Sequence, residues 1–149
     1  MKQGIFKISE NTKLVVFTHA SNVTGEIMPI YEIGKLCHQH GILFCVDAAQ
    51  TAGIEDINVI NDNINYLCIA PHKGLYSPMG LGILIVRKPI YRTITEGGTG
   101  SYSNLLVQPD DLPDKLESGT INLPGIAGLS AGLDFIKDTG IKRIREHET

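Results

Sequence analysis

The sequence lacks the features that would assign it to a membrane or to a nucleic-acid partner. No apolar stretch among its 149 residues reaches the roughly 18 residues that a transmembrane helix requires. The net charge is only −3, so no basic excess points to nucleic acid or to an anionic membrane. Lys7, Glu10 and Lys13 interrupt the apolar residues near the N-terminus, so no signal-peptide pattern opens there. These absences favour the cytoplasm.

Cysteine is scarce, and several catalytic motifs are missing. The three cysteines are Cys37, Cys45 and Cys68, an odd number without the spacing of metal ligands. Each lies in an apolar or amphipathic segment, which favours reduced thiols buried in a core over reactive thiols. The sequence also has no Ser-His-Asp hydrolase elbow, no zinc-ligand spacing and no glycine-rich dinucleotide fingerprint. No metal site is predicted.

What the sequence does contain is the alternation of apolar runs and helical periodicity that is typical of an α/β protein. Four short apolar runs are expected strands: residues 14–18, 42–46, 66–69 and 80–86. Three segments with helical spacing are expected helices: residues 29–40, 126–137 and 141–149. The 50–63 segment has no clear period, and 108–124 is expected to be a long connection. The pattern predicts one α/β domain with a mostly parallel sheet and flanking helices.

Polar residues follow the first three expected strands at the point where each strand ends. In strand order they are His19 and Asn22, then Asp47 and Gln50, then His72 and Lys73. Ligands of open α/β sheets bind outside the carboxyl ends of the strands, where these residues would gather. The convergence predicts a ligand site at this edge of the sheet.

Each of these residues also has a plainer interpretation. Lys73 fits a solvated loop lysine, or a lysine that condenses with a carbonyl group. Asp47 fits an N-cap for a helix beginning at Ala48, a ligand-binding acid, or both. His72 fits a structural hydrogen bond or a phosphate contact. The Gly97–Gly100 loop is only a weak phosphate-loop signal, because it has no P-loop lysine.

An acid at one strand end and a His-Lys pair at a later one is an arrangement that pyridoxal phosphate (PLP) chemistry needs. The lysine would hold the cofactor as a Schiff base, and the acid would keep the pyridine nitrogen protonated. His19 and Asn22 could instead shape a turn, with Gly25 supplying the sharp bend.

Several segments together resemble the class V aminotransferase family of PLP-dependent enzymes, in its cysteine desulfurase and selenocysteine lyase branch. The matching segments are Thr18–Gly25, Val46–Gln50, His72–Gly74, Glu117–Asn122 and Gly125–Leu129. They follow the order and spacing of that branch over nearly the whole chain. The resemblance implies part of the large domain of the fold type I aminotransferases, acting as a homodimer.

The resemblance also implies a role for each site residue. Lys73 would be the Schiff-base lysine and would shuttle the proton at the substrate α-carbon, while Asp47 would hold the pyridinium nitrogen. Gln50 would bond the ring phenolate oxygen, with Asn22 near that oxygen and the substrate. His72 would bind the phosphate. Thr120 would reach the phosphate of the neighbouring subunit.

Two departures from the family pattern bear on the cofactor. Ala70 and Pro71 stand where the family often has Ser and Gly. Loss of the serine hydroxyl removes a hydrogen bond to a charged phosphate, worth about 1.5–3 kcal/mol. Pro71 stiffens the loop and removes an N–H donor. The phosphate is therefore expected to be held more weakly or differently.

Family members are much longer than this chain. Residues 1–149 are expected to be a partial PLP-binding large domain, without its N-terminal part and without the C-terminal small domain. The substrate-binding arginine and the nucleophilic cysteine of the family would then lie outside these residues, because no cysteine here occupies the nucleophile position.

Three functions remain open at the level of sequence. The parent protein would remove sulfur or selenium from cysteine or selenocysteine to give alanine, with a possible sulfur-acceptor protein as partner. Alternatively, it would transaminate another small amino acid. The third interpretation is a non-catalytic fragment, since the chain alone lacks the groups that select the substrate and attack its sulfur.

Overall fold

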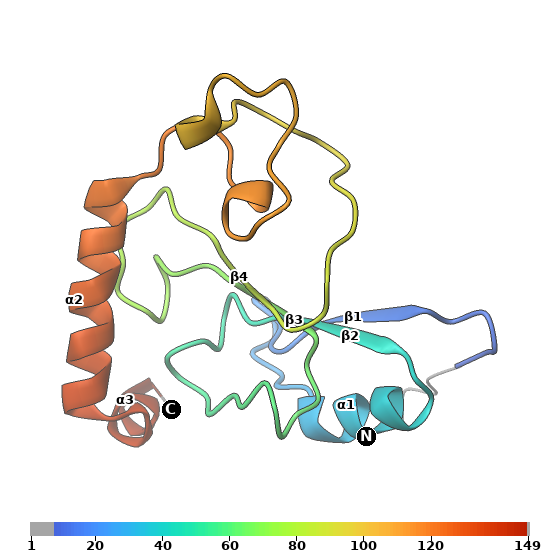
Figure 1. Ribbon diagram of the computed structural model, residues 1–149. Helices are drawn as coiled ribbons and strands as arrows, with labels where there is room; N and C mark the ends of the chain where they lie inside the picture. Colours follow the sequence, from blue (N-terminus) through green and yellow to red (C-terminus); the bar gives the residue numbers. More distant parts are fainter. Residues whose placement is uncertain (1–7, 149) are drawn as a thin grey trace.

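The computed structural model describes residues 8–148 (Figure 1). Its elements in chain order are β1 (Leu14–Thr18), α1 (Ile30–Gln39), β2 (Leu43–Asp47), β3 (Tyr66–Ile69), β4 (Ile83–Val86), two short 3₁₀ turns η1 (Gly100–Tyr102) and η2 (Asp114–Leu116), α2 (Leu123–Thr139) and α3 (Ile141–Glu148). No helix within residues 8–148 is long and apolar enough to cross a bilayer.

The strands form one mixed sheet in the order β1-β2-β3-β4. β1, β2 and β3 run parallel, with α1 crossing from β1 to β2, and β4 pairs antiparallel with β3. The predicted mostly parallel sheet with flanking helices is therefore confirmed. The carboxyl ends of the first three strands meet at one edge, because their pairing places Thr18 beside Asp47 and Asp47 beside Cys68.

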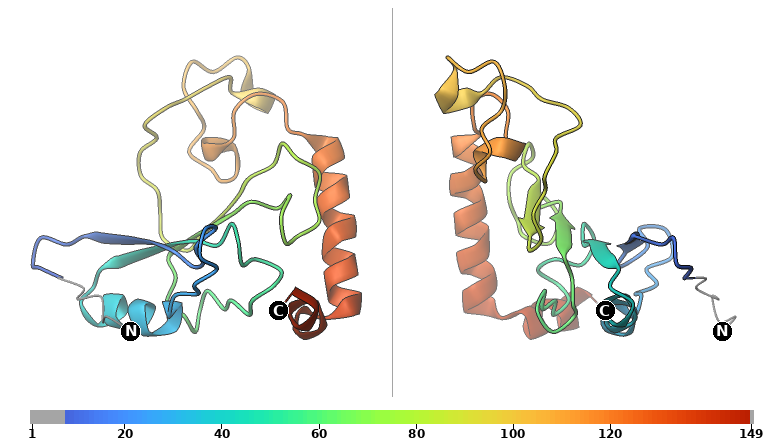
Figure 2. Two further views of the ribbon diagram at one scale, coloured as in Figure 1. Left: turned by 180° about the vertical axis from the view of Figure 1, so that it is seen from behind. Right: turned by 45° about the vertical axis from the view of Figure 1, so that its right-hand side comes forward.

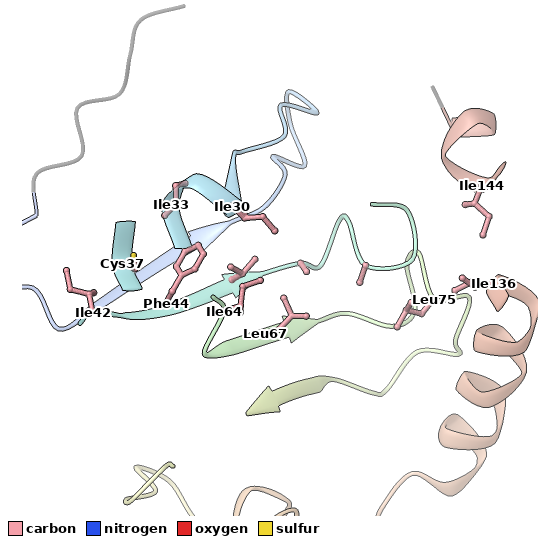
Figure 3. Packing of buried hydrophobic residues seen from close by; sticks show 13 residues of the cluster. Ile30, Ile33, Cys37, Ile42, Phe44, Ile64, Leu67, Leu75, Ile136 and Ile144 are labelled. Carbon is pink, nitrogen blue, oxygen red and sulfur yellow. The ribbon is translucent and has the colours of Figure 1, made fainter. Parts of the chain in front are cut away.

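α1 covers one face of the sheet, and the side chains packed between them form most of the core. Ile33 and Cys37 of α1 lie over Phe44 of β2, which has no exposed surface (Figure 3). Gly34 lets α1 approach the backbone at Asp62 closely, because a Cβ there would lie 1.9 Å from the carbonyl oxygen of Asp62. A small residue at this position of the helix is thus required by packing.

The opposite face of the sheet is largely open in the part of the chain that the structure describes. Val16 is 63% exposed and Leu84 is 44% exposed, although both belong to strands. Apolar runs on both faces are typical of parallel sheets covered on both sides. Within residues 8–148, only one face of this sheet is covered.

The cysteines divide between these two environments. Cys37 is buried on the inner side of α1, as predicted. Cys45 and Cys68 are only half-buried, so the expectation that all three are core thiols was wrong for this pair. The alternation of side chains along β2 and β3 turns these two toward the open face of the sheet.

The two C-terminal helices lie at the opposite end of the molecule from β1 and α1 (Figure 2). Asn122 caps α2 by accepting a hydrogen bond from the Gly125 N–H at 3.1 Å, and a proline lies in the first turn. The helix therefore begins at Leu123, three residues before the predicted start. Its Gly132 packs against the backbone at Leu75, where a Cβ would lie 2.2 Å from the carbonyl oxygen.

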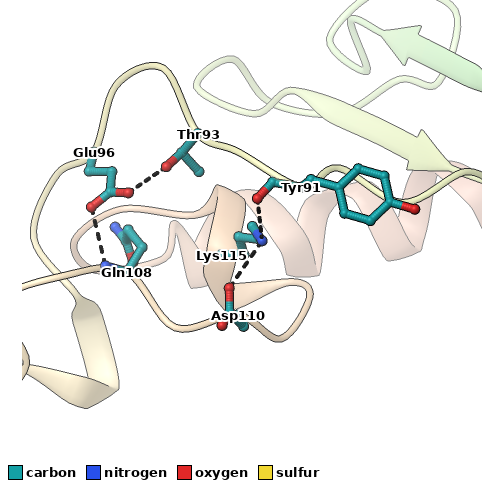
Figure 4. Close-up of polar contacts among 6 residues, drawn as sticks. All are labelled: Tyr91, Thr93, Glu96, Gln108, Asp110 and Lys115. Carbon is teal, nitrogen blue, oxygen red and sulfur yellow. Dashed lines mark hydrogen bonds and ion pairs between the residues drawn. The ribbon is translucent and has the colours of Figure 1, made fainter.

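Residues 87–122, hereafter the excursion, form a long irregular segment on the β4 side of the sheet (Figures 1 and 2). Polar contacts hold it together (Figure 4). Lys115 Nζ donates to the Tyr91 carbonyl at 3.5 Å and pairs with Asp110 at 3.2 Å. Glu96 accepts from the Thr93 hydroxyl and from the Gln108 N–H, and these bonds lower the pKa of the Glu96 carboxyl.

Candidate functional site

Three segments follow the parallel strands and are named here the strand-end segments: residues 19–25, 47–51 and 70–74. Backbone hydrogen bonds continue the sheet into the first two of these segments. The His19 N–H donates to the Asp47 carbonyl at 2.9 Å, and the Ala48 N–H donates to the Cys68 carbonyl at 2.9 Å. The ends of β1, β2 and β3 are therefore held in one layer, as the sequence predicted.

Asp47 closes β2 and turns the chain. Its Oδ1 accepts a hydrogen bond from the Ala49 N–H at 2.9 Å, which is the pattern of an Asx turn. No helix follows, so the interpretation of Asp47 as a helix N-cap was wrong: residues 49–51 form a turn, and Ala52 forms an isolated bridge with Glu55. The carboxylate is half-buried and lies on the same side of the sheet as Cys45 and Cys68.

An open hollow of about 420 Å³ lies beside Asp47. Its lining residues are Asp47, Ala49, Cys68, Ile69, Ala70, Gly82, Ile83 and Leu84. Apart from the Asp47 carboxylate and the Cys68 thiol, the side chains are apolar. One acid facing an otherwise apolar wall is the kind of surface that binds a flat heterocycle with a protonated ring nitrogen.

The segment after β3 presents His72 and Lys73 to solvent. Both side chains are exposed, and no hydrogen bond or ion pair within residues 8–148 engages the Lys73 amine. The backbone around them is fixed, because the Lys73 N–H donates to the Ala70 carbonyl at 3.2 Å and the Ser77 N–H donates to the Pro71 carbonyl at 3.1 Å. A free amine thus sits on an ordered turn.

The turns after β2 and β3 touch through their backbones at two glycines. A Cβ at Gly53 would lie 2.2 Å from the Gly74 carbonyl oxygen, and a Cβ at Gly74 would lie 2.3 Å from the Ala52 carbonyl oxygen. Gly53 also has φ +87°, which disfavours other residues. This contact packs the turn that carries Gln50 against the turn that carries Lys73.

Asn22 lies in an exposed turn after β1. The Ser21 hydroxyl organises this turn by accepting from the N–H groups of Val23 and Thr24, both at 3.2 Å. Gly25 has φ +69°, so the sharp bend predicted for it is present. Asn22 is therefore presented at the same edge of the sheet as Asp47.

Thr120 belongs to a different part of the molecule. It is exposed in the excursion, where the neighbouring Gly119 N–H donates to the Gly98 carbonyl at 2.7 Å. A Cβ at Gly97 would lie 2.6 Å from the Ser118 Cβ, so this glycine permits the close approach of two loop segments. Within residues 8–148, no hydrogen bond or ion pair joins Thr120 to the strand-end segments.

The structure also brings to the site residues to which the sequence assigned no role there. Thr51 is buried and its hydroxyl lies 2.8 Å from His19 Nδ1. Ala49 and Cys68 line the hollow beside Asp47. Ala49 lies within the Val46–Gln50 segment already noted in the sequence, so its position was a usable signal. The contact of Thr51 with His19 instead depends on the pairing of β1 with β2.

The Cys68 thiol affects the neighbouring Cys45 thiol. Burial first, and then the neighbouring Cys68 thiol and the Asp47 carboxylate, raise the pKa of Cys45 to about 11. Burial likewise raises the pKa of Cys37. Thiolates are the nucleophilic form, so Cys37 and Cys45 are poorly suited to attack a substrate at neutral pH.

Comparison with known proteins gives a consistent assignment. The family model for class V aminotransferases matches residues 2–149. A probable cysteine desulfurase from Methanothermobacter thermautotrophicus is 34% identical over 145 residues, covering 94% of this chain and 36% of that protein.

Solved structures agree. The apo structure of a cysteine desulfurase from Thermococcus onnurineus NA1 superposes with a TM-score of 0.75 at 33% identity, covering 92% of this chain and 36% of that one. The cysteine desulfurase CsdA from Escherichia coli gives a TM-score of 0.72 at 26% identity, covering 91% and 35%.

The chain thus spans little more than a third of the length of the relatives that it matches. Its mixed, mostly parallel sheet is the corresponding part of their fold type I architecture. The family match covers nearly all residues, including the strand-end segments that carry Asp47 and Lys73. The chain belongs to the class V aminotransferase family, whose members are PLP-dependent enzymes.

Proposed function

We propose that the protein containing this chain is a PLP-dependent, cysteine desulfurase-like enzyme. It would remove sulfur, or selenium, from cysteine or selenocysteine and leave alanine. The observation that supports this most directly is the edge where the strand ends meet, with Asp47 beside an apolar hollow and the Lys73 turn packed on the Gly53 turn. The names of the relatives supply the substrate class.

The residues at this edge fit PLP in part. The Asp47 carboxylate and the apolar wall of the hollow suit a protonated pyridine ring, and the exposed Lys73 amine is available for a covalent link. The phosphate is less well provided for, because Ala70 offers no hydroxyl and Pro71 no N–H. His72 and groups outside the strand-end segments would have to bind it.

When bound, PLP supplies an electron sink for the negative charge that develops at the substrate α-carbon. Lys73 would hold the cofactor and move the α-proton. Asp47 would keep the ring nitrogen protonated, Gln50 would bond the ring oxygen, and Asn22 would face the same oxygen and the substrate. A proton held at the ring nitrogen makes the sink effective, so Asp47 has the largest electronic influence.

Three further features belong to the same proposal. Thr120, in the excursion, would reach the phosphate bound by a neighbouring subunit. The enzyme would therefore be a homodimer. A sulfur-acceptor protein would receive the released sulfur. The cytoplasm, a reducing compartment, would be the site of action.

The lysine assignment can be tested on the protein that contains this chain. After reconstitution with PLP, borohydride reduction should leave the cofactor mass on the peptide that contains Lys73. Lys73→Ala should abolish that modification, and the matched control Lys142→Ala, in exposed α3, should leave it unchanged. A modified peptide elsewhere, or none from the unaltered protein, would contradict the assignment.

The reaction is tested separately by supplying cysteine to the PLP-loaded protein. Alanine and sulfide, in the presence of a reductant, support the desulfurase function. Release of a keto acid with amino-group transfer would instead place the protein among the aminotransferases of the family. Because the borohydride test needs no turnover, failure of catalysis would not be confused with failure to bind the cofactor.

A further inference from the structure

A buried polar pair connects two of the strand-end segments. His19, which directly follows β1, is 4% exposed, and Thr51, which ends the turn after β2, is 2% exposed. The His19 Nδ1 and Thr51 Oγ1 atoms lie 2.8 Å apart, the distance of a good hydrogen bond. The two residues are 32 positions apart in the chain, so the bond joins segments that only the fold brings together.

Backbone bonds place this pair next to the proposed cofactor groups. The His19 N–H donates to the Asp47 carbonyl at 2.9 Å, and the His19 carbonyl accepts from the Met28 N–H at 2.8 Å. The Thr51 N–H donates to the Ala48 carbonyl at 3.1 Å. His19 is therefore fixed on both sides, and Thr51 belongs to the same turn as Asp47 and directly follows Gln50.

The hydrogen bond suits a neutral imidazole. Burial lowers the pKa of His19, and the Glu55 and Asp62 carboxylates oppose that effect only partly. A neutral imidazole can donate or accept at Nδ1, and the threonine hydroxyl can do the same, so the pair satisfies both buried groups. The bond thus holds the turn without placing a cation near Asp47.

We propose that His19 and Thr51 are positioning residues whose hydrogen bond orients the Asp47-to-Gln50 turn relative to the turn that carries Asn22. This inference rests on the proposed function, because it assigns the pair to the groups that hold the PLP ring. Without the bond, the 47–51 turn keeps its covalent connection to β2 but loses its side-chain attachment to the end of β1. The direction of the Asp47 and Gln50 side chains toward the ring would then be less well defined.

The test uses the protein that contains this chain, loaded with PLP. Thr51→Val removes the hydroxyl and keeps the shape of the side chain, whereas Thr51→Ser keeps the hydroxyl. Two measurements are made on each variant: the dissociation constant for PLP, and the pH dependence of the absorption band of the bound cofactor. Thermal unfolding of the apoprotein monitors stability alone.

Thr51→Val should weaken PLP binding about tenfold, since a buried hydrogen-bonding group left unpaired changes an equilibrium by roughly that factor. It should also shift the pH midpoint of the cofactor band, because that midpoint depends on the ring contacts of Asp47 and Gln50. Thr51→Ser should restore both values. If Thr51→Val lowers only the apoprotein melting temperature and leaves both cofactor measurements unchanged, the pair is merely structural and the inference is wrong.

A second pair of variants covers the case in which Thr51→Val does not fold. His19→Asn places its amide near the position of Nδ1 and should bind PLP as tightly as the unaltered protein. His19→Gln places its amide near Nε2 and should weaken PLP binding as Thr51→Val does. Equal binding by these two variants would overturn the positioning role. If the unaltered protein binds no PLP at all, the proposed function fails, which is a distinguishable result.

Discussion

The sheet region, residues 14–86, and the excursion, residues 87–122, are held together by different forces. The sheet region packs apolar side chains such as Phe44 and Val46 out of solvent, and backbone ladders satisfy its polar groups. The excursion leaves large apolar side chains such as Ile94 and Leu106 fully exposed. Its order depends on polar contacts such as those of Lys115 and Glu96 (Figure 4).

The difference matters for the site, because the proposed cofactor groups divide between the two regions. Asp47, Gln50 and Lys73 stand on turns that continue the sheet, where packing and hydrogen bonds fix the backbone. Thr120 stands in the excursion, where Gln108 Oε1 is buried without a hydrogen-bond partner among the described residues. Rigid elements position functional groups more accurately than loops do.

The largest effect is expected from emptying the core of the sheet region. Phe44→Ala should lower the free energy of unfolding by about 3–5 kcal/mol, because it removes a fully buried aromatic ring and leaves a cavity. Ile94→Ala in the excursion should change it by less than about 0.5 kcal/mol, since that side chain is exposed. Urea unfolding of both variants measures the contrast. If both variants lost the same free energy of unfolding, the Ile94 side chain would have to be packed in solution.

A smaller effect should come from the glycine contact between the two site turns. Gly53→Ala introduces a Cβ 2.2 Å from the Gly74 carbonyl oxygen at φ +87°. Gly119→Ala, in the excursion, meets a similar φ of +73° but nothing within 4 Å. Gly53→Ala should therefore be more destabilising than Gly119→Ala by about 1–3 kcal/mol, the cost of overpacking. Thermal unfolding of both variants measures this difference in stability. A difference near zero would contradict the close approach of the two turns.

Breaking the polar contacts of the excursion should have a local effect. Lys115→Met keeps the buried stem but loses the amine contacts to the Tyr91 carbonyl and Asp110, worth about 1 kcal/mol. Amide hydrogen exchange should rise across residues 91–118 and stay unchanged in β2. Asp110→Asn is the control and should change little, because that carboxylate is exposed. Faster exchange in β2 would mean that the two regions unfold together.

The smallest effect should be a pH dependence that belongs to the sheet region. The folded state binds a proton at His19 less readily than the unfolded state does. In the unfolded state the pKa of His19 is near its ordinary value of 6.5. The unfolded state then holds more protons below about that pH, so stability falls as pH is lowered through this range. Between pH 7.5 and 5.5, the melting temperature of His19→Asn should depend less on pH than that of the unaltered protein. This range extends about one unit on either side of the ordinary histidine pKa. An identical pH profile would exclude His19 as the cause.

Much of the sheet could be predicted because its signals are local. The runs at 14–18 and 66–69 coincide with β1 and β3, and the helical spacing from 29 to 40 marks α1 to within a residue. The strand expected over 80–86 is shorter, beginning at Ile83, because Gly80 has φ +95° and breaks the extended backbone. The start of α2 was missed because its cap, Asn122, resembles an ordinary loop residue until the Gly125 bond is seen.

The site was predictable to the extent that it follows from strand ends. Asp47, Gln50, His72 and Lys73 are brought to one edge as expected, since parallel strands direct their carboxyl ends the same way. The roles assigned to these residues and to Asn22 and Thr120 remain predictions. The hollow beside Asp47 could not be foreseen, because it depends on how β4 pairs with β3.

By itself, the sequence determined the order of strands and helices, the edge of the sheet that carries the polar groups, and the resemblance to the class V aminotransferases. These depend on residues close together in the chain. The tertiary structure alone decided which thiols are buried, that Thr51 bonds His19, and that the Gly53 turn touches the Gly74 turn. Those features require contacts between residues far apart in the chain, and the pairing of strands sets these contacts rather than any local pattern.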